Sequence, residues 1–345
     1  MMKRVMSLGL SLALAISLAA CSSSVSEAAS SAAATEEPTA VPEAEAPVTT
    51  FRIAGLKGPT TMGMVKLMSD AEAGETRQDY QVTMYGAADE VVPLLVKGDI
   101  DLAAIPANLA ANLYNQTEGK VQVAAINTLG VLYVVTTGDN VKSVEDLKGK
   151  TIYSTGKGTT PEYVLNYILK ENGIDPEKNL TVEYKSEATE VAAALQAAGE
   201  GAIAVLPQPY VTAAQSQIEG LNVVLNLTEE WNKVSTDSDL VTGVLVARTE
   251  FIEQNEAAFE EFLKDYQSSI EWVNSNTADA AELVANYGIV AKAPLAQKAL
   301  PACNITYVDG AEMKTKLSGY LQVLFDQNPK AVGGAMPGDD FYYGA

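Results

Sequence analysis

The strongest constraint on the fold is an alternation of short apolar strands and amphipathic helices that starts after residue 50 and starts again near residue 143. The first round predicts strands at 51–56, 80–85, 100–105, 121–126 and 131–137, with helices at 60–73, 91–98 and 108–115. The second round predicts strands at 151–154, 180–184, 202–206 and 221–225, with helices at 161–171, 188–198 and 209–217. A strand at 240–247 precedes a mostly helical remainder. This pattern is typical of α/β proteins, and about 300 residues are enough for two domains.

Residues 1–20 are predicted to be a signal peptide. Lys3 and Arg4 precede an apolar run that is too short and too rich in Ser and Ala for a stable membrane span. The run ends in Leu-Ala-Ala-Cys at 18–21, which resembles the lipobox of bacterial lipoproteins. That resemblance implies lipidation of Cys21 and a membrane anchor. The alternative is an uncleaved signal anchor, and both interpretations place the rest of the chain outside the cytoplasm.

Residues 21–49 are predicted to be a disordered linker that starts at the lipidated cysteine. They are mostly Ser, Ala, Glu, Thr and Pro, a composition that cannot bury enough apolar surface to offset the entropy of ordering. The whole chain has 44 acidic and 23 basic residues, which gives a formal charge of −21. Such a charge makes nucleic acid an unsuitable partner.

The sequence contains no histidine, and this absence excludes several classes of function. A Ser-His-Asp triad and a histidine-ligated metal site are both impossible. Once Cys21 carries lipid, Cys303 has no partner for an internal disulfide, and one thiol is too few for a zinc site. Neither a Gly-x-Gly-x-x-Gly motif nor a phosphate loop is present. We therefore predict no cofactor, no metal and no enzymatic activity.

Two loops carry the chemistry of a ligand site. Open α/β sheets bind ligands beyond the carboxyl ends of their strands. Each loop combines a glycine, a proline near a helix start, and hydroxyls beside free amides. Across a cleft, the two helix N-termini would offer donors to an anionic or carbonyl group, although ordinary N-capping is the alternative. The candidates are Lys57, Gly58, Thr60 and Thr61 in the first loop and Gly158, Thr159 and Thr160 in the second.

Further candidates lie at predicted strand ends and crossings. These are Asn108, Leu129, Gly130, Gln208, Tyr210 and Thr242. Asn108 could bind a ligand or cap a helix. The aromatic side chains of Tyr85, Tyr133, Tyr210 and Trp231 could stack on a flat ligand or belong to the core. The arginines after the linker are Arg52, Arg77 and Arg248, all outside the candidate loops, so a bidentate clamp on a carboxylate is not evident.

Four segments together resemble the extracytoplasmic solute-binding proteins of ABC importers, in the branch that includes sulfonate, nitrate and thiamine-pyrimidine binders. They are Gly-Leu-Lys-Gly-Pro-Thr at 55–60, the segment 97–106 around Gly-Asp-Ile-Asp, the segment 144–152, and Phe-Tyr-Tyr at 341–343. The resemblance implies an α/β, two-lobed, type 2 periplasmic-binding-protein fold with two hinge crossings and a ligand cleft between the lobes. We place the crossings near Thr137 and Leu240, so that 50–137 plus 240–345 form lobe 1 and 138–239 form lobe 2.

The same resemblance implies a function. The chain would be the lipid-anchored substrate-binding component of an ABC importer, and it would capture a small anionic or heteroaromatic nutrient and deliver it to a membrane permease with its ATPase. One alternative is an exported enzyme on the same fold, with Lys57, Lys157 or Glu162 as a cleft acid or base. Another alternative is a surface scaffold whose cleft is filled by side chains.

Overall fold

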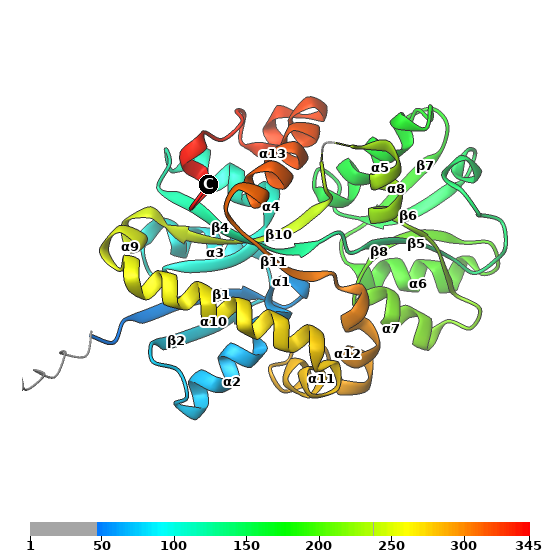
Figure 1. Cartoon of the computed structure of the whole chain (residues 1–345). Coiled ribbons are helices and arrows are strands. Elements are labelled where there is room, and N and C mark those ends of the chain that lie inside the picture. Colours follow the sequence, from blue (N-terminus) through cyan, green and yellow to red (C-terminus); the bar gives the residue numbers. More distant parts are fainter. Residues whose placement is uncertain (1–46, 237) are drawn as a thin grey trace, which may run out of the picture. The chain divides into compact units, whose positions relative to one another are not determined.

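The computed structural model describes residues 47–236 and 238–345. The predicted signal peptide, Cys21 and nearly all of the predicted linker lie outside the described residues. Pro47–Ala345 is one compact unit, and its described strands form two sheets (Figure 1). No helix in the described part of the chain is both long and apolar enough to cross a membrane.

The larger sheet has six strands in the order β11-β4-β10-β3-β1-β2. Its strands are β1 (Thr50–Leu56), β2 (Asp79–Tyr85), β3 (Leu102–Pro106), β4 (Val121–Leu129), β10 (Val241–Arg248) and β11 (Ile305–Val308). β1 pairs parallel to both β2 and β3, whereas β10 lies antiparallel between β3 and β4. We name the elements built around this sheet lobe 1.

The smaller sheet has five strands in the order β7-β6-β8-β5-β9. Its strands are β5 (Leu132–Thr136), β6 (Thr151–Thr155), β7 (Thr181–Lys185), β8 (Ile203–Pro207) and β9 (Asn222–Asn226). β6 pairs parallel to β7 and β8, and β5 lies antiparallel between β8 and β9. We name the elements built around this sheet lobe 2.

Helices cover both sheets. In lobe 1 they are α1 (Pro59–Met62), α2 (Val65–Ala73), α3 (Ala88–Lys97), α4 (Ala107–Gln116), α9 (Thr249–Gln254), α10 (Glu256–Ser275), α11 (Thr277–Asn286), α12 (Ala293–Ala299) and α13 (Gly310–Gln327). In lobe 2 they are α5 (Thr160–Glu171), α6 (Ala188–Ala198), α7 (Tyr210–Gln217) and α8 (Leu227–Val234). Short 3₁₀ turns occur at η1 (Val144–Leu147), η2 (Leu300–Ala302), η3 (Pro329–Val332) and η4 (Asp339–Phe341).

The chain first changes sheets between Leu129 and Leu132, not near Thr137 as expected. The strand predicted at 131–137 is β5, and it pairs with β8 and β9 of the smaller sheet. Every residue of β5 is buried, as expected for a strand that lies between two others and is covered on both faces. The chain returns through α8 into β10. The boundaries of the two domains remain predictions.

The single helix predicted at 60–73 is interrupted after α1. The hydroxyl of Ser269, on α10, donates to the Gly63 carbonyl at 2.7 Å and accepts from the Leu67 amide at 3.0 Å. These two backbone groups would bond each other in a continuous helix, so the inserted side chain breaks the hydrogen-bond ladder. Gly63 also permits the close approach of α10, because a Cβ there would lie 2.6 Å from Ile270 Cγ1.

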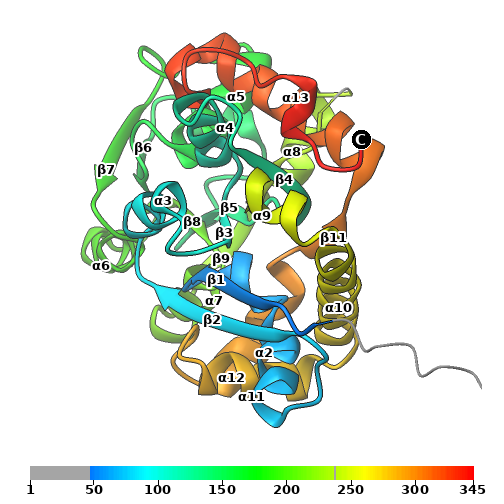
Figure 2. The same cartoon turned by 90° about the vertical axis from the view of Figure 1, so that its left-hand side faces the viewer.

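An aromatic core fills one side of lobe 1. The rings of Phe51, Tyr80, Phe259, Phe262 and Tyr266 are all buried and lie within 5.2 to 6.1 Å of a neighbouring ring in this group. Phe259, Phe262 and Tyr266 of α10 thus belong to the core of lobe 1. Figure 2 shows α2, α11 and α12 gathered on this side of β1 and β2, beside one end of α10.

Candidate ligand-binding site

The N-termini of α4 and α5 meet between the two lobes. Each helix follows the carboxyl end of a strand, β3 in lobe 1 and β6 in lobe 2. The Thr160 hydroxyl donates to the Asn108 side-chain carbonyl at 3.4 Å. Two predicted site residues from different lobes are thus adjacent at the position where α/β sheets bind ligands.

Tyr320, on α13, adds an unpartnered polar group to this junction. Its side chain has no exposed surface, and its hydroxyl makes no hydrogen bond with any described residue. Burial raises the pKa of the Tyr320 hydroxyl, and the nearby Thr160 hydroxyl offsets part of that rise without meeting hydrogen-bond geometry. Buried hydroxyls are nearly always satisfied, so this unpartnered group makes the junction a candidate site for a polar atom of a ligand.

Gly243 lies next to the predicted residue Thr60 at the start of β10. A Cβ at Gly243 would lie 2.4 Å from Thr60 Cγ2 and 2.7 Å from Asn127 Oδ1, so only glycine fits here without displacement. Thr61 is fully buried, and its hydroxyl lacks a partner within residues 47–236 and 238–345. Gly58 precedes α1 with an extended backbone. Because glycine has no side chain, the N-terminus of α1 has no side-chain cap.

The two crossings also come together. A Cβ at Gly130 would lie 2.1 Å from Thr228 Oγ1 and 2.6 Å from Leu240 Cδ2, so the outgoing and returning segments pack directly on each other. The buried hydroxyls of Thr228 and Thr242 have no hydrogen-bond partner in the described chain. Leu129 is half-buried, and its amide donates to the Asn304 carbonyl at 3.0 Å.

The second candidate loop uses most of its donors internally. The Gly158 amide donates to Glu162 Oε2 at 2.5 Å, and the Thr159 amide and hydroxyl both donate to the Gly156 carbonyl, at 2.9 and 2.7 Å. Only Thr160 points its hydroxyl at the other lobe. Thr159 stands at the N-cap position of α5 but makes no side-chain cap, so neither ligand binding nor N-capping by this threonine is seen, and its role in the site stays a prediction.

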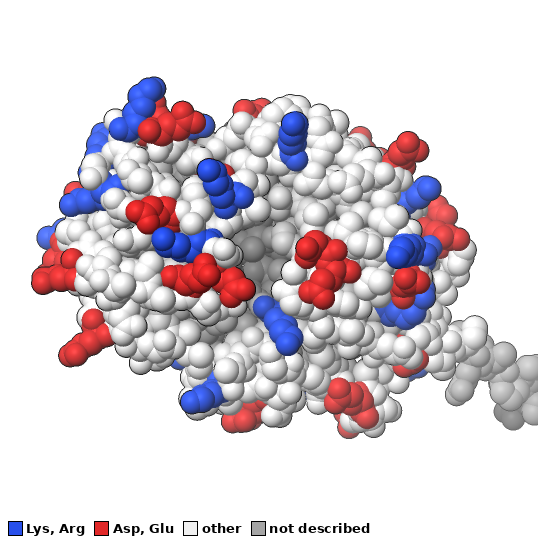
Figure 3. Space-filling model, turned by 180° about the vertical axis from the view of Figure 1, so that it is seen from behind, with Lys and Arg blue, Asp and Glu red and all other residues white. Residues whose placement is uncertain are grey.

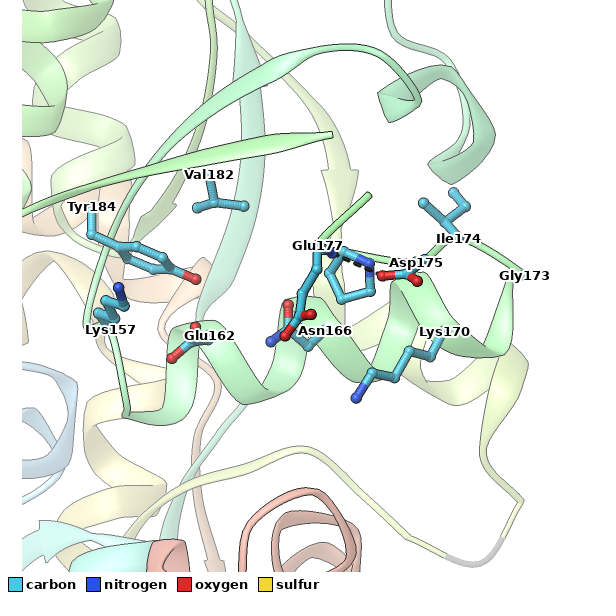
Figure 4. Close-up of a pocket in the computed structure, with 11 residues that line it drawn as sticks. Lys157, Glu162, Asn166, Lys170, Gly173, Ile174, Asp175, Glu177, Val182 and Tyr184 are labelled. Carbon is cyan, nitrogen blue, oxygen red and sulfur yellow. Dashed lines mark hydrogen bonds between the residues drawn. The ribbon is translucent and has the colours of Figure 1, made fainter. Parts of the chain in front are cut away.

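A groove of about 770 Å³ runs along α5 toward β7 (Figure 4). Lys157 lies at one end of it, with its ammonium 6.0 Å from the centre of the Tyr184 ring. Burial, followed by the Glu162 carboxylate, raises the pKa of Tyr184. Lys157 and Glu162, two of the possible acids or bases, thus lie in this groove with Tyr184.

The remaining candidates differ in exposure. Gln208 is buried, and its side-chain carbonyl accepts from the Thr212 hydroxyl at 2.8 Å. Tyr210, at the start of α7, is 41% exposed and free to stack. Trp231 is fully buried against Tyr167 and Tyr320, so the stacking role considered for it is wrong.

Tyr133 and Tyr85 differ in how deeply their rings are buried. Tyr133 is buried and donates through its hydroxyl to the Ala302 carbonyl at 2.9 Å, so it too belongs to the packed interior. Tyr85 is half-buried and packs against the apolar core. Sequence position alone did not separate these two rings from Tyr210.

The arginines of the described chain all lie beside carboxylates. Arg52 pairs with the buried carboxylate of Asp101 at 2.5 Å, and Arg248 lies 3.5 Å from the same carboxylate. Arg77 lies 3.5 Å from Glu261. Lys57 is exposed and makes no ion pair among the described residues, although its amide donates to the Tyr85 carbonyl.

Figure 3 shows one face of the molecule with a hollow near its middle, between the two lobes, and charged side chains around the rim. No three Cys, Asp or Glu side chains in the described residues are grouped so that they could hold a metal ion. The groups that meet inside the junction are amides and hydroxyls. Such a site binds through hydrogen bonds from uncharged donors and acceptors.

Sequence reasoning missed Tyr320, Thr228 and Asn127. Thr228 had a local signal, since it follows Asn226 at the end of β9, and the Asn226 side chain accepts from the Thr228 amide. Tyr320 lies in the middle of a helix far along the chain, and only packing brings it to Thr160. No local pattern could have indicated that position.

Comparison with known proteins identifies relatives of this chain. The profile of the family described as NMT1/THI5 like matches residues 79–280. The protein YtlA of Bacillus subtilis (strain 168) is 26% identical over 134 residues, which are 39% of this chain and 38% of YtlA. The match therefore spans well under half of that relative.

Solved structures share the fold over most of the chain. A protein of an ABC transporter from Parabacteroides distasonis is 25% identical with a TM-score of 0.70, covering 86% of this chain and 98% of the other. The periplasmic aliphatic sulphonate binding protein SsuA from Escherichia coli is 19% identical with a TM-score of 0.67, covering 84% and 91%. The predicted two-lobed α/β fold of periplasmic binding proteins is confirmed by these matches.

Proposed function

Because this chain belongs to the NMT1/THI5-like family, we propose that it is the solute-binding component of an ABC importer. It captures a small solute between its lobes and delivers it to a membrane permease whose energy comes from a separate ATPase. A lipid on Cys21 holds it at the outer side of the cell membrane. The matched structures support this proposal, since they include a protein of an ABC transporter and a periplasmic sulphonate-binding protein.

The observation that carries the proposal is the junction of α4, α5 and α13. It combines a hydrogen bond between lobes, from Thr160 to Asn108, with the unpartnered hydroxyl of Tyr320. A solute that bonds these groups contacts both lobes at once. It therefore stabilises the closed arrangement relative to an open one, which is the differential contact that a conformational switch requires.

Other contacts between the lobes would be made and broken in the same movement. Gln327 is the last residue of α13, and Asn328 follows it. Their side-chain amides donate to the backbone carbonyl and the hydroxyl of Tyr163 on α5, at 3.1 and 3.0 Å. Lys316 pairs with Asp239 at 2.7 Å beside the returning crossing.

The test is a solute screen on the full-length chain in detergent. Native mass spectrometry identifies any solute that remains bound through purification, and thermal unfolding followed by tryptophan fluorescence then ranks solutes, beginning with sulphonates, nitrate and uncharged nutrients. A solute at about 100 times its Kd stabilises the fold by about 2.7 kcal/mol. We expect a saturable shift for one chemical class.

Two matched variants locate the binding. Thr160→Phe fills the junction and should abolish the shift, whereas Thr189→Phe, at an exposed position of α6, should leave it unchanged. If no solute in a broad screen of ligand-stripped protein shifts unfolding, or if Thr160→Phe binds as the unmodified chain does, the proposed function is wrong. A surface scaffold would then be the better interpretation.

A further inference from the structure

The chain's own carboxylate occupies the place where an anion would bind at α5. Glu162, in the first turn, accepts the Gly158 amide at 2.5 Å. The Thr159 amide is taken by the Gly156 carbonyl, and Pro161 has no amide hydrogen. Among the described residues, the Thr160 amide is the one backbone donor from Gly158 to Glu162 without a partner. A helix N-terminus attracts anions through its free amides and its partial positive charge, and here the Glu162 carboxylate takes one amide and offsets that charge.

Cations do not replace these lost donors. Lys157 lies over the Tyr184 ring in the groove of Figure 4, beside Glu162. The three arginines of the described residues all lie by carboxylates, Arg52 and Arg248 by Asp101 and Arg77 by Glu261. Lys57 and Lys157 both lack an ion pair in the described chain, and both are exposed. Exposed ammonium groups are weak anchors because water screens them.

The polar groups that stay available at the junction are uncharged. Tyr320 presents a fully buried hydroxyl without a partner in the described chain. Asn108 uses its side-chain carbonyl for Thr160, which leaves its amide hydrogens without an acceptor among residues 47–236 and 238–345. A hydroxyl and an amide can donate to a carbonyl or ring nitrogen and accept from a hydroxyl or amine.

We infer that the junction takes a small uncharged polar solute, and that Glu162 is the residue that excludes anions. This inference rests on the proposed function and narrows it. Specificity often depends on a repulsive element as much as on attractive contacts, and the Glu162 carboxylate bound to the loop before α5 is such an element. An anion at α5 would face this like charge and find no more than one free backbone donor.

The test measures anion binding directly. Isothermal titration of sulfate and of ethanesulfonate is carried out on the full-length chain in detergent and on Glu162→Ala, which frees the Gly158 amide and removes the charge. We expect no saturable binding to the unmodified chain at millimolar anion and at least about a tenfold gain in affinity for Glu162→Ala, or about 1.4 kcal/mol. Glu162→Gln, which removes the charge and keeps an acceptor, should show a smaller gain. Glu171→Ala, at the exposed far end of α5, should show none.

Two results would overturn the inference. The first is one-to-one binding of either anion by the unmodified chain that is lost in Thr160→Phe or in Lys57→Gln. The second is a folded Glu162→Ala, shown by unchanged tryptophan fluorescence, that gains no anion binding. Neither result affects the proposed function, because a cleft that binds an anion still belongs to a solute-binding protein. The proposed function instead fails if no solute of any charge binds.

Discussion

The two lobes have the same strand order but different cores. Five strands of lobe 1 run β2-β1-β3-β10-β4, with β11 added beyond β4, and lobe 2 runs β7-β6-β8-β5-β9; in both the fourth strand is antiparallel to the third and arrives from the other lobe. The helices after the second strands also correspond. Glu90 in α3 accepts the Ala87 amide, and Glu190 in α6 accepts the Ser186 amide, each at 2.9 Å. The two lobes thus share the strand order and also the hydrogen bond from a backbone amide to a glutamate at the start of the corresponding helix.

The cores show where the lobes diverge. All six phenylalanines of the chain lie outside residues 131–240, and lobe 1 carries α10, α11 and α12 in addition to the shared elements. Lobe 2 packs mainly aliphatic side chains around its sheet, such as Val191, Leu195 and Leu206. The comparison teaches that strand order does not require a particular core, and that lobe 1 buries more aromatic surface to stabilise the molecule.

The largest expected effect is on the aromatic core that lobe 2 lacks. Phe262→Ala removes a buried ring that stacks on Phe51 at 5.2 Å and on Tyr266 at 5.8 Å. We expect a loss of about 3–5 kcal/mol in the free energy of unfolding, measured by denaturant titration. Phe325→Ala, at a half-buried position of α13, is the control and should cost less. Equal losses in the free energy of unfolding would show that a ring in the aromatic cluster stabilises the fold no more than a half-buried ring outside it.

The second prediction tests the repeat with matched positions. Leu95 in α3 and Leu195 in α6 occupy the same helical position and are 1% and 0% exposed. Leu95→Ala and Leu195→Ala should each cost about 2–5 kcal/mol, because each leaves a cavity of similar size. Both should shift a single unfolding transition. Two separate transitions in either variant would mean that the lobes unfold independently.

The smallest expected effect concerns the crossing strands. Gly243 in β10 pairs with Pro106, and its counterpart in lobe 2, Leu132 in β5, pairs with Pro207. Gly243→Ala forces a Cβ against Thr60 and should cost about 1–3 kcal/mol and weaken solute binding. Calorimetric titration with the solute found in the screen measures the second effect. Unchanged stability and affinity would place Thr60 outside the site.

Periodicity predicted most of the fold. The strands and helices of lobe 2 were predicted within one or two residues, because each is short, apolar on a clear face and bounded by turn residues. Two elements were missed. α8 looks polar, with Glu229, Glu230 and Lys233 beside the buried Trp231, and β11 has only four residues.

The candidate site was only partly accessible to the same reasoning. Thr60, Asn108 and Thr160 were found because helix starts after strands have a recognisable composition, and the structure brings Asn108 and Thr160 together. Gly158 and Thr159 have the same composition, yet their donors bond within the loop. A sequence lists donors and acceptors but does not assign partners to them.

The sequence by itself determined the α/β class, the repeated strand-helix rhythm and the absence of histidine chemistry, because these depend on local periodicity and composition. Only the tertiary structure decided which sheet receives β5, why Ser269 of α10 divides one predicted helix into two, and that Tyr320 faces Thr160. Each of these depends on contacts between residues far apart in the chain, and such contacts exist only after the apolar faces have packed.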